Sequence, residues 1–191
     1  MPDHAGAWVP TVGPPDSIDG DGVRLRRWAV ERAGVMHSLV TANIDHLRPW
    51  MPWIAHEPLT EGDRRSLLAE WESAWAARTD FAYLLEMDGV PVGSAGLHSR
   101  RGRGVLEIGY WVSATTTGRG VATAAASALA RHALAMHDVH AVEIHHDSAN
   151  IASGRVAEKA GFTQVSTYRR EVTAPGESGT SVRWVLSRQA R

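Results

Sequence analysis

The chain has 191 residues, of which 43% are hydrophobic, and its formal net charge at pH 7 is −1. These values predict one domain with a substantial core, and neither a nucleic acid nor a membrane as partner. The sequence contains no cysteine, which excludes disulfides, thiolate metal sites and a covalent intermediate on sulfur. It shows no membrane-length apolar run and no secretion signal at its start, so we expect a cytoplasmic protein.

The first third of the chain predicts an arm, a strand and two helices. Residues 1–20 are rich in Pro, Gly and Asp, which is typical of an irregular arm, so we place the domain at residues 21–191. An alternating pattern predicts a strand at 23–26, and a helical pattern covers 30–47. A loop rich in Pro and Trp follows at 46–54. Thr60 and Asp63 then form a capping-box pattern for a helix that ends near residue 79.

The rest of the chain alternates between strands and helices. Strands are predicted at 81–87 and 90–97, joined by an Asp88-Gly89 hairpin turn, and at 105–113. A long Ala-rich helix follows residue 120. A strand at 140–145, a helix at 150–160 that stops at Gly161, and strands at 162–172 and 181–186 complete the order. This order predicts a single α/β (α+β) domain with a mixed, mostly antiparallel sheet of six to seven strands and about four helices.

The turn before the Ala-rich helix has the composition of an anion site. Gly118 and Gly120 allow backbone conformations and close ligand approaches that other residues do not. The first turn of a helix has main-chain N–H groups without helical partners, and the helix dipole is positive there. The sequence therefore predicts a pyrophosphate cradle, with its amides on Thr117, Gly118, Arg119, Gly120, Val121, Ala122 and Thr123.

Three blocks in this order resemble the GCN5-related N-acetyltransferase (GNAT) family, and within it the RimJ/RimL-type subgroup. They are residues 107–112 (EIGYWV), 117–122 (TGRGVA) and 150–162 (NIASGRVAEKAGF). Thr117 departs from the family pattern, which has Gln or Arg there. The resemblance extends over roughly residues 20–188. It implies binding of acetyl-CoA, acetyl transfer to an amine, and a sheet that splays between the fourth and fifth strands.

The resemblance also implies where coenzyme A lies. Its pyrophosphate would bind the turn at 117–123, and its pantetheine arm would pair with Trp111, Val112 and Ser113 like an added strand. Asn150 would bind the arm or would simply cap its helix. Ser153 would donate a hydrogen bond to the leaving thiolate, or would only satisfy the first turn of its helix.

Without a cysteine, direct attack by the acceptor amine on the thioester is favoured, and the ammonium must first lose a proton. Glu107 is the expected base, because partial burial would raise the pKa of its carboxyl toward a useful range. Alternatively Glu107 is a solvated polar residue, and Glu171 is the rival base. A backbone N–H near Val112 would stabilise the oxyanion, as the family resemblance implies.

The sequence gives fewer indications of the residues that bind the acceptor amine. We expect Trp50 and Trp53, on the Pro-rich loop, to bind the acceptor together with Glu107 and His145. The arginines at 100, 101 and 103 indicate a solvated hairpin tip or a contact with an acidic acceptor. The late histidines lack the spacing of a metal site.

The expected acceptor is a protein N-terminus or a small aminoacyl or amine compound, and the protein is a possible homodimer. Two alternatives stay open: a non-catalytic acyl-CoA-binding module of the same fold, and an acyltransferase that uses another acyl-CoA. A nucleotide hydrolase is disfavoured, because no Gly-Lys-Ser/Thr follows the glycine turn.

Overall fold

The fold is given by a computed structural model that describes residues 8–188. In chain order the elements are β1 (Ser17–Asp19), β2 (Arg24–Arg27), η1 (Val30–Arg32), α1 (Ala33–Thr41), α2 (Ile44–Leu47), η2 (Pro52–His56), α3 (Glu61–Ala77), β3 (Asp80–Met87), β4 (Val90–His98), β5 (Val105–Val112), η3 (Ala114–Thr116), α4 (Val121–Ala135), β6 (Ala141–Asp147), α5 (Ile151–Lys159), β7 (Thr163–Arg169) and β8 (Thr180–Ser187). Within residues 8–188, no helix combines the length and apolarity needed to cross a bilayer.

One sheet organises the domain, in the order β1-β2-β3-β4-β5-β6-β8-β7. Every neighbouring pair is antiparallel except β5 and β6, which are parallel because helix α4 carries the chain back between them. The predicted α/β class with a mixed, mostly antiparallel sheet is confirmed. The sheet has eight strands rather than six to seven, since the prediction missed β1.

Strand β1 lies inside the stretch that we expected to be irregular. It pairs with β2, and the side chain of Ile18 is 1% exposed in the core. Thr11 also donates its main-chain N–H to the Asp138 carboxylate at 2.7 Å. Residues 8–20 therefore pack as part of the domain, and residues 1–7 of the predicted arm lie outside the described residues. A three-residue strand has too short an alternating pattern to stand out in the sequence.

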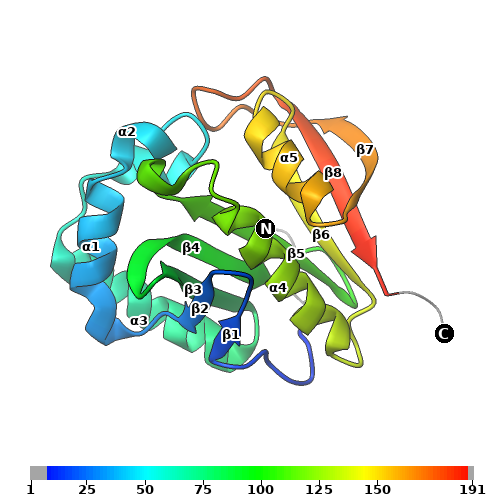
Figure 1. Cartoon of the computed structure of the whole chain (residues 1–191), viewed down its shortest axis with the longest axis horizontal. Helices are drawn as coiled ribbons and strands as arrows, with labels where there is room; N and C mark the ends of the chain where they lie inside the picture. The colour runs from blue at the N-terminus through cyan, green and yellow to red at the C-terminus, as the bar shows by residue number, and fades with distance from the viewer. Residues whose placement is uncertain (1–7, 189–191) are drawn as a thin grey trace, which may run out of the picture.

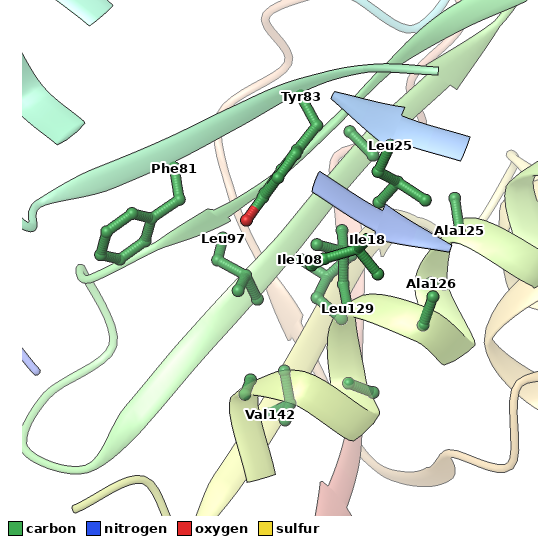
Figure 2. Packing of buried hydrophobic residues seen from close by; sticks show 14 of the residues in the cluster. Ile18, Leu25, Phe81, Tyr83, Leu97, Ile108, Ala125, Ala126, Leu129 and Val142 are labelled. Atoms are coloured by element: carbon green, nitrogen blue, oxygen red, sulfur yellow. The ribbon is translucent and has the colours of Figure 1, made fainter. Parts of the chain in front are cut away.

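Helices cover both faces of the sheet (Figure 1). We call the side covered by α4 and α5 the α4 face, and the side covered by α1 and α3 the α3 face. On the α4 face, Ala125, Ala126 and Leu129 pack on strand residues such as Ile108 and Val142 (Figure 2). Small alanine side chains let the helix approach the sheet closely, so that α4 and the turn before it are held firmly.

The α3 face has its own cluster, which includes Trp28, Met36, Leu68 and Leu84. Helix α3 begins at the predicted capping box, where Thr60 and Asp63 exchange hydrogen bonds. The helix predicted over 30–47 is divided instead into η1, α1 and α2.

Asn43 lies at the break between α1 and α2, and its side chain ties this break to the end of β5. Its Oδ1 accepts a hydrogen bond from the Ser113 hydroxyl at 3.1 Å and another from the Ala114 N–H at 2.9 Å. The buried amide therefore fixes the point at which β5 leaves the sheet.

The predicted splay lies between β5 and β6, the fourth and fifth of the strands expected from sequence. Their pairing runs from Val105 opposite Ala141 to Ile108 opposite Ile144 and stops there. Strand β5 nevertheless continues to Val112, and β6 continues to Asp147. The two strands therefore part over the last residues of each, at the end that leads to α4 and α5.

Candidate active site

A cavity of about 350 Å³ occupies the region where β5 and β6 part. Because side chains alternate along a strand, residues from both faces of the sheet line it. Tyr110, His146 and Ser153 contribute from the α4 face, whereas Glu107 and His145 contribute from the α3 face. The cavity therefore joins the two faces through the sheet.

The predicted cradle lies at the start of α4, and its residues are not part of the cavity lining. Gly118 and Gly120 have φ angles of 79° and 82°, a region that favours glycine, and Gly120 is the residue that precedes the helix. A Cβ atom at either position would meet no atom within 4 Å, so the space beyond both glycines is open. This open, glycine-shaped turn fits a pyrophosphate on the first-turn amides of α4.

The residues predicted for the cradle are not equivalent. The N–H groups of Thr117 and Arg119 donate to the carbonyl oxygens of Ala114 and Thr116, at 3.4 and 3.3 Å. Those two amides are already engaged, and the side chains of both residues are exposed. Val121 is buried, while Ala122 and Thr123 are half-buried in the first turn of the helix. The amides suited to an anion are therefore those of residues 118 and 120–123.

Of the three residues predicted to pair with the pantetheine arm, Val112 is the one that directs its main-chain groups to the gap. Ser113 donates its N–H to Val92 on the β4 side at 2.7 Å, and main-chain groups alternate in direction along a strand. The groups of Val112 thus point away from β4, whereas those of Trp111 and Ser113 point toward it. The main chain of Trp111 and Ser113 is therefore engaged with β4, and binding of a pantetheine arm by residues 111–113 stays a prediction.

Helix α5 brings Asn150 and Ser153 to the α4-face side of the cavity. Asn150 caps the helix, because its side chain accepts a hydrogen bond from the Ser153 N–H at 3.1 Å. The Tyr110 hydroxyl lies 2.9 Å from the Ser153 hydroxyl. Burial raises the pKa of Tyr110 to about 12, so this group stays protonated and can donate. Sequence reasoning missed Tyr110, although its alternation with Ile108 places it on the α4 face.

The carboxylate of Glu107 is bound by two arginines. Its side chain is buried, and it accepts hydrogen bonds from Arg100 at 2.8 and 3.1 Å and a further one from Arg101. Burial alone would raise the pKa of Glu107, but the two guanidinium groups outweigh burial and lower it to about 2. The expected raised pKa is therefore wrong, and the predicted solvated hairpin tip contributes two ion-pair partners to the cavity wall.

Two other predicted residues lie away from the cavity. Strand β7 ends at Arg169 rather than at 172, which leaves Glu171 exposed in the following loop and absent from the cavity wall. Trp53 packs against Trp111, with 6.2 Å between the ring centroids, in the α3-face cluster. Trp50 does line the cavity, so the Pro-rich loop supplies one tryptophan to the cavity and one to the core.

His145 lines the cavity as predicted and belongs to a chain of polar groups on the α3 face. Its Nε2 lies 2.7 Å from a Glu143 carboxylate oxygen, and its Nδ1 lies 3.0 Å from the Tyr168 hydroxyl. Arg183 pairs with the same glutamate. Glu143 and Tyr168 were missed by sequence reasoning, because they are brought together by strand order and not by spacing along the chain.

The loop between β7 and β8 forms one rim of the cavity. Asp147 fixes it by accepting hydrogen bonds from the N–H groups of Ser178 and Gly179, at 2.8 and 3.0 Å. Gly176 donates its N–H to the carbonyl of Pro49 at 2.9 Å, next to Trp50. The Trp50 loop and the 174–179 loop thus meet over the α3-face side.

Comparison with known proteins agrees with this geometry. Residues 23–163 match the family model described as an acetyltransferase (GNAT) domain. The chain belongs to the GNAT acetyltransferase family. As a GNAT member it is an acetyl-CoA-dependent N-acetyltransferase.

Similar proteins include ribosomal-protein acetyltransferases. A Bacillus subtilis (strain 168) protein named "Putative ribosomal N-acetyltransferase YdaF" is 26% identical over 148 residues, which are 77% of this chain and 81% of that protein. The structure of RimL, a ribosomal L7/L12 α-N-protein acetyltransferase in complex with coenzyme A, superposes with a TM-score of 0.81 at 18% identity, covering 90% of this chain and 97% of RimL. RimJ of Mycobacterium smegmatis, in complex with a CoA disulfide, gives a TM-score of 0.75 at 24% identity, covering 95% and 88%.

Proposed function

We propose that this GNAT enzyme acetylates the α-amine of a protein N-terminus or of a small aminoacyl compound, by direct attack in a ternary complex. The observation that carries the proposal is the cavity through the parted strands, which Tyr110 and Ser153 line from the α4 face and His145 lines from the α3 face. The two substrates can then approach the same point from opposite sides of the sheet. The sequence has no cysteine to hold the acetyl group between two half-reactions.

Acetyl-CoA supplies the acetyl group as an activated thioester. The amides of residues 118 and 120–123 would hold its pyrophosphate, and Asn150 and the main chain of Val112 would hold its pantetheine arm. The N–H of Val112 faces the gap and would donate to the oxyanion that forms at the thioester carbon. These donors are fixed in direction before any substrate binds, which lowers the cost of organising them during the reaction.

Ser153 is the proposed donor to the leaving thiolate. Its hydroxyl lies on the α4 face, where the cofactor would enter, and Tyr110 lies 2.9 Å away with its own proton retained. When Tyr110 donates to the Ser153 oxygen, the serine proton is free to point into the cavity. Glu107 has a different proposed role from the one expected, because a carboxylate with a pKa of about 2 is a poor proton acceptor at neutral pH. Instead it would hold Arg100 and Arg101 in place in the cavity wall.

Two observations support the proposed acceptor class, one from similar proteins and one from the cavity rim. RimL is described as an α-N-protein acetyltransferase, and a Salmonella typhimurium relative is described as modifying the N-terminal serine of ribosomal protein L7/L12. In this chain the rim carries Trp50 and Arg170 over the α3-face side. An extended peptide terminus or an aminoacyl group would lie between these side chains with its amine directed into the cavity.

The test is an acetylation assay with purified protein and acetyl-CoA. Peptides with a free N-terminal serine or alanine, aminoacyl amides, and the same peptides blocked at the N-terminus are compared by release of free thiol and by mass. We expect a gain of one acetyl group on free α-amines only. Coenzyme A binding without transfer to any amine would contradict the proposal and would favour a binding module. Faster transfer from a longer acyl-CoA than from acetyl-CoA would identify the longer acyl-CoA as the preferred donor.

A further inference from the structure

The acceptor ammonium must give its proton to a group with a free lone pair. Most ionisable groups in the cavity wall have their lone pairs engaged in hydrogen bonds. Glu107 is saturated by two guanidinium groups. His146 uses both ring nitrogens, since Nδ1 lies 2.8 Å from the Asp147 carbonyl and Nε2 accepts from Trp184 at 2.9 Å. It also faces α5, on the cofactor side.

The acidic residues of the rim are also engaged. Asp147 accepts main-chain N–H groups from Ala149, Ser178 and Gly179. Glu177 accepts those of Thr173 and Ala174 and pairs with Arg170. Both carboxylates therefore hold loops in place, and neither is free to take a proton without releasing its loop.

The chain Glu143–His145–Tyr168 differs from these groups. The Glu143 carboxylate is 3% exposed and is fixed by Arg183, whose Nε donates to it at 2.9 Å. Burial raises the pKa of Glu143, but hydrogen bonds from Arg183 and His145 outweigh burial and keep it below the usual range, so the group is anionic. An anionic partner at 2.7 Å requires a proton on His145 Nε2. The Nδ1 lone pair then faces the Tyr168 hydroxyl at 3.0 Å.

Tyr168 connects this chain to the acceptor side. It lies on β7, opposite Ser181 of β8, and its ring meets the His145 ring edge-on with 6.0 Å between centroids. Both residues line the cavity, and Tyr168 is 39% exposed while the His145 side chain is 8% exposed. The hydroxyl is thus the accessible end of the chain, and the imidazole is its sheltered end.

We propose that Tyr168 and His145 remove the proton from the acceptor ammonium, with Glu143 as the positioning residue that fixes the imidazole tautomer. This inference rests on the proposed function. The ammonium gives one proton to the Tyr168 oxygen while the tyrosine hydroxyl proton moves to His145 Nδ1. The neutral amine attacks the thioester carbon, a C–N bond forms, and the C–S bond breaks. After the attack, the acceptor nitrogen loses a second proton, and the leaving thiolate takes up one proton to become the thiol of coenzyme A. His145 then releases the first proton to solvent.

The charges around His145 determine its pH behaviour. Glu143 on β6, Glu107 on β5, Arg101 from the β4–β5 connection, Arg183 on β8 and Tyr168 on β7 face it, and His146 is its neighbour on β6. Burial, together with the Arg101 charge, outweighs the attraction of the two glutamates and lowers the pKa of His145 below 6.5. The imidazole is consequently neutral at pH 7, as a proton acceptor must be.

The experiment compares Tyr168→Phe, His145→Gln and the double variant with wild type. Each is tested between pH 6 and pH 9.5 with the serine peptide or aminoacyl amide that wild type acetylates faster. We expect kcat/KM at pH 7 to fall about 100-fold in each single variant, as for loss of a general base. The loss should shrink as the pH passes the amine pKa, because the amine is then already neutral. The double variant should be no slower than the slower single variant, because both residues act in one chain.

Controls separate this inference from folding and from the proposed function. Tyr168→Phe keeps the ring, and coenzyme A titration should give unchanged affinity in every variant because the donor site is on the opposite face. His132→Gln, a histidine on α4 outside the cavity wall, should act within twofold of wild type. The relay would be overturned if kcat/KM fell by the same factor at pH 7 and pH 9.5, or if the two single-variant losses multiplied in the double variant. Either result would leave the proposed acetyl transfer intact. A wild type that binds coenzyme A but acetylates no amine would overturn both.

Discussion

The two faces of the parted strands offer a ligand different chemistry. On the α4 face, the groups suited to a ligand are main-chain amides, placed by glycines with φ angles of 79° and 82°. On the α3 face they are charged side chains that hold one another, as in Glu107 with Arg100 and Arg101, and Glu143 with Arg183 and His145. Backbone donors suit a constant ligand such as a pyrophosphate, whereas a network of side chains can differ between relatives with different acceptors.

The largest effect is expected from a substitution that disrupts only the main-chain amides of the cradle on the α4 face. Gly120→Val forces a β-branched residue to a φ of 82° and turns the first amides of α4 away from the cradle. Loss of two or three charge-assisted hydrogen bonds should weaken coenzyme A binding by roughly 1000-fold, measured by calorimetry. Gly89→Val is the matched control, because Gly89 has a φ of 76° in the remote β3–β4 turn. Equal losses of affinity in the two variants would show that strain, and not the cradle, is responsible.

The second effect concerns the charged side chains of the α3 face and is measured as a change in the free energy of unfolding. The folded-state pKa of Glu107, about 2, is below its ordinary value of 4.5, so its contribution is complete above pH 4.5 and is lost as the pH falls to about 2. At about 1.4 kcal/mol per pH unit, Glu107→Gln should lower the free energy of unfolding by about 3 kcal/mol at pH 7.

Chemical denaturation at several pH values measures this contribution. The unfolding free energy of the Glu107→Gln variant should depend less on pH between 4.5 and 2 than that of wild type. The exposed Glu171→Gln is the control and should change stability by less than about 0.5 kcal/mol. An acid limb of the pH–rate profile that disappears in Glu107→Gln would restore Glu107 as the base.

The smallest effect concerns the hydrogen bond that Ser153 is proposed to donate to the leaving thiolate on the α4 face. Ser153→Ala removes one hydrogen bond to a charged group, so kcat should fall by about 10- to 30-fold with coenzyme A affinity unchanged. Tyr110→Phe should produce a smaller decrease, because it acts through Ser153. Single-turnover kinetics separates this step from binding. An acceptor-dependent change in KM without a change in kcat would place Ser153 in substrate binding instead.

Local patterns predicted the elements that have strong local causes. The capping box at Thr60, the hairpin turn at Asp88 and the glycine turn before α4 all appear where the sequence placed them. Strand β1 was missed because it is short, and the break at Asn43 was missed because its cause is a hydrogen bond to residues 113 and 114, far along the chain.

The residues of the site show the same difference between features with local causes and features that depend on distant segments. Residue type and position led to the predictions for the glycine turn and for four side chains that line one cavity, Trp50, His145, Asn150 and Ser153. The ionisation of Glu107 was predicted in the wrong direction, since burial was visible in the pattern but the arginines that bind the carboxylate were not assigned to it. Glu143 and Tyr168 carry no local signal at all.

The sequence by itself determined the family, most of the order of elements and the glycine turn before α4, because these depend on residues that are neighbours along the chain. Only the tertiary structure decided which charges meet. Strand order places β6 beside β5 and β8, and this brings Glu143, Arg183 and His145 together on one face. A carboxylate's pKa depends on every charge within a few ångströms, and those charges come from segments that only the folded sheet brings side by side.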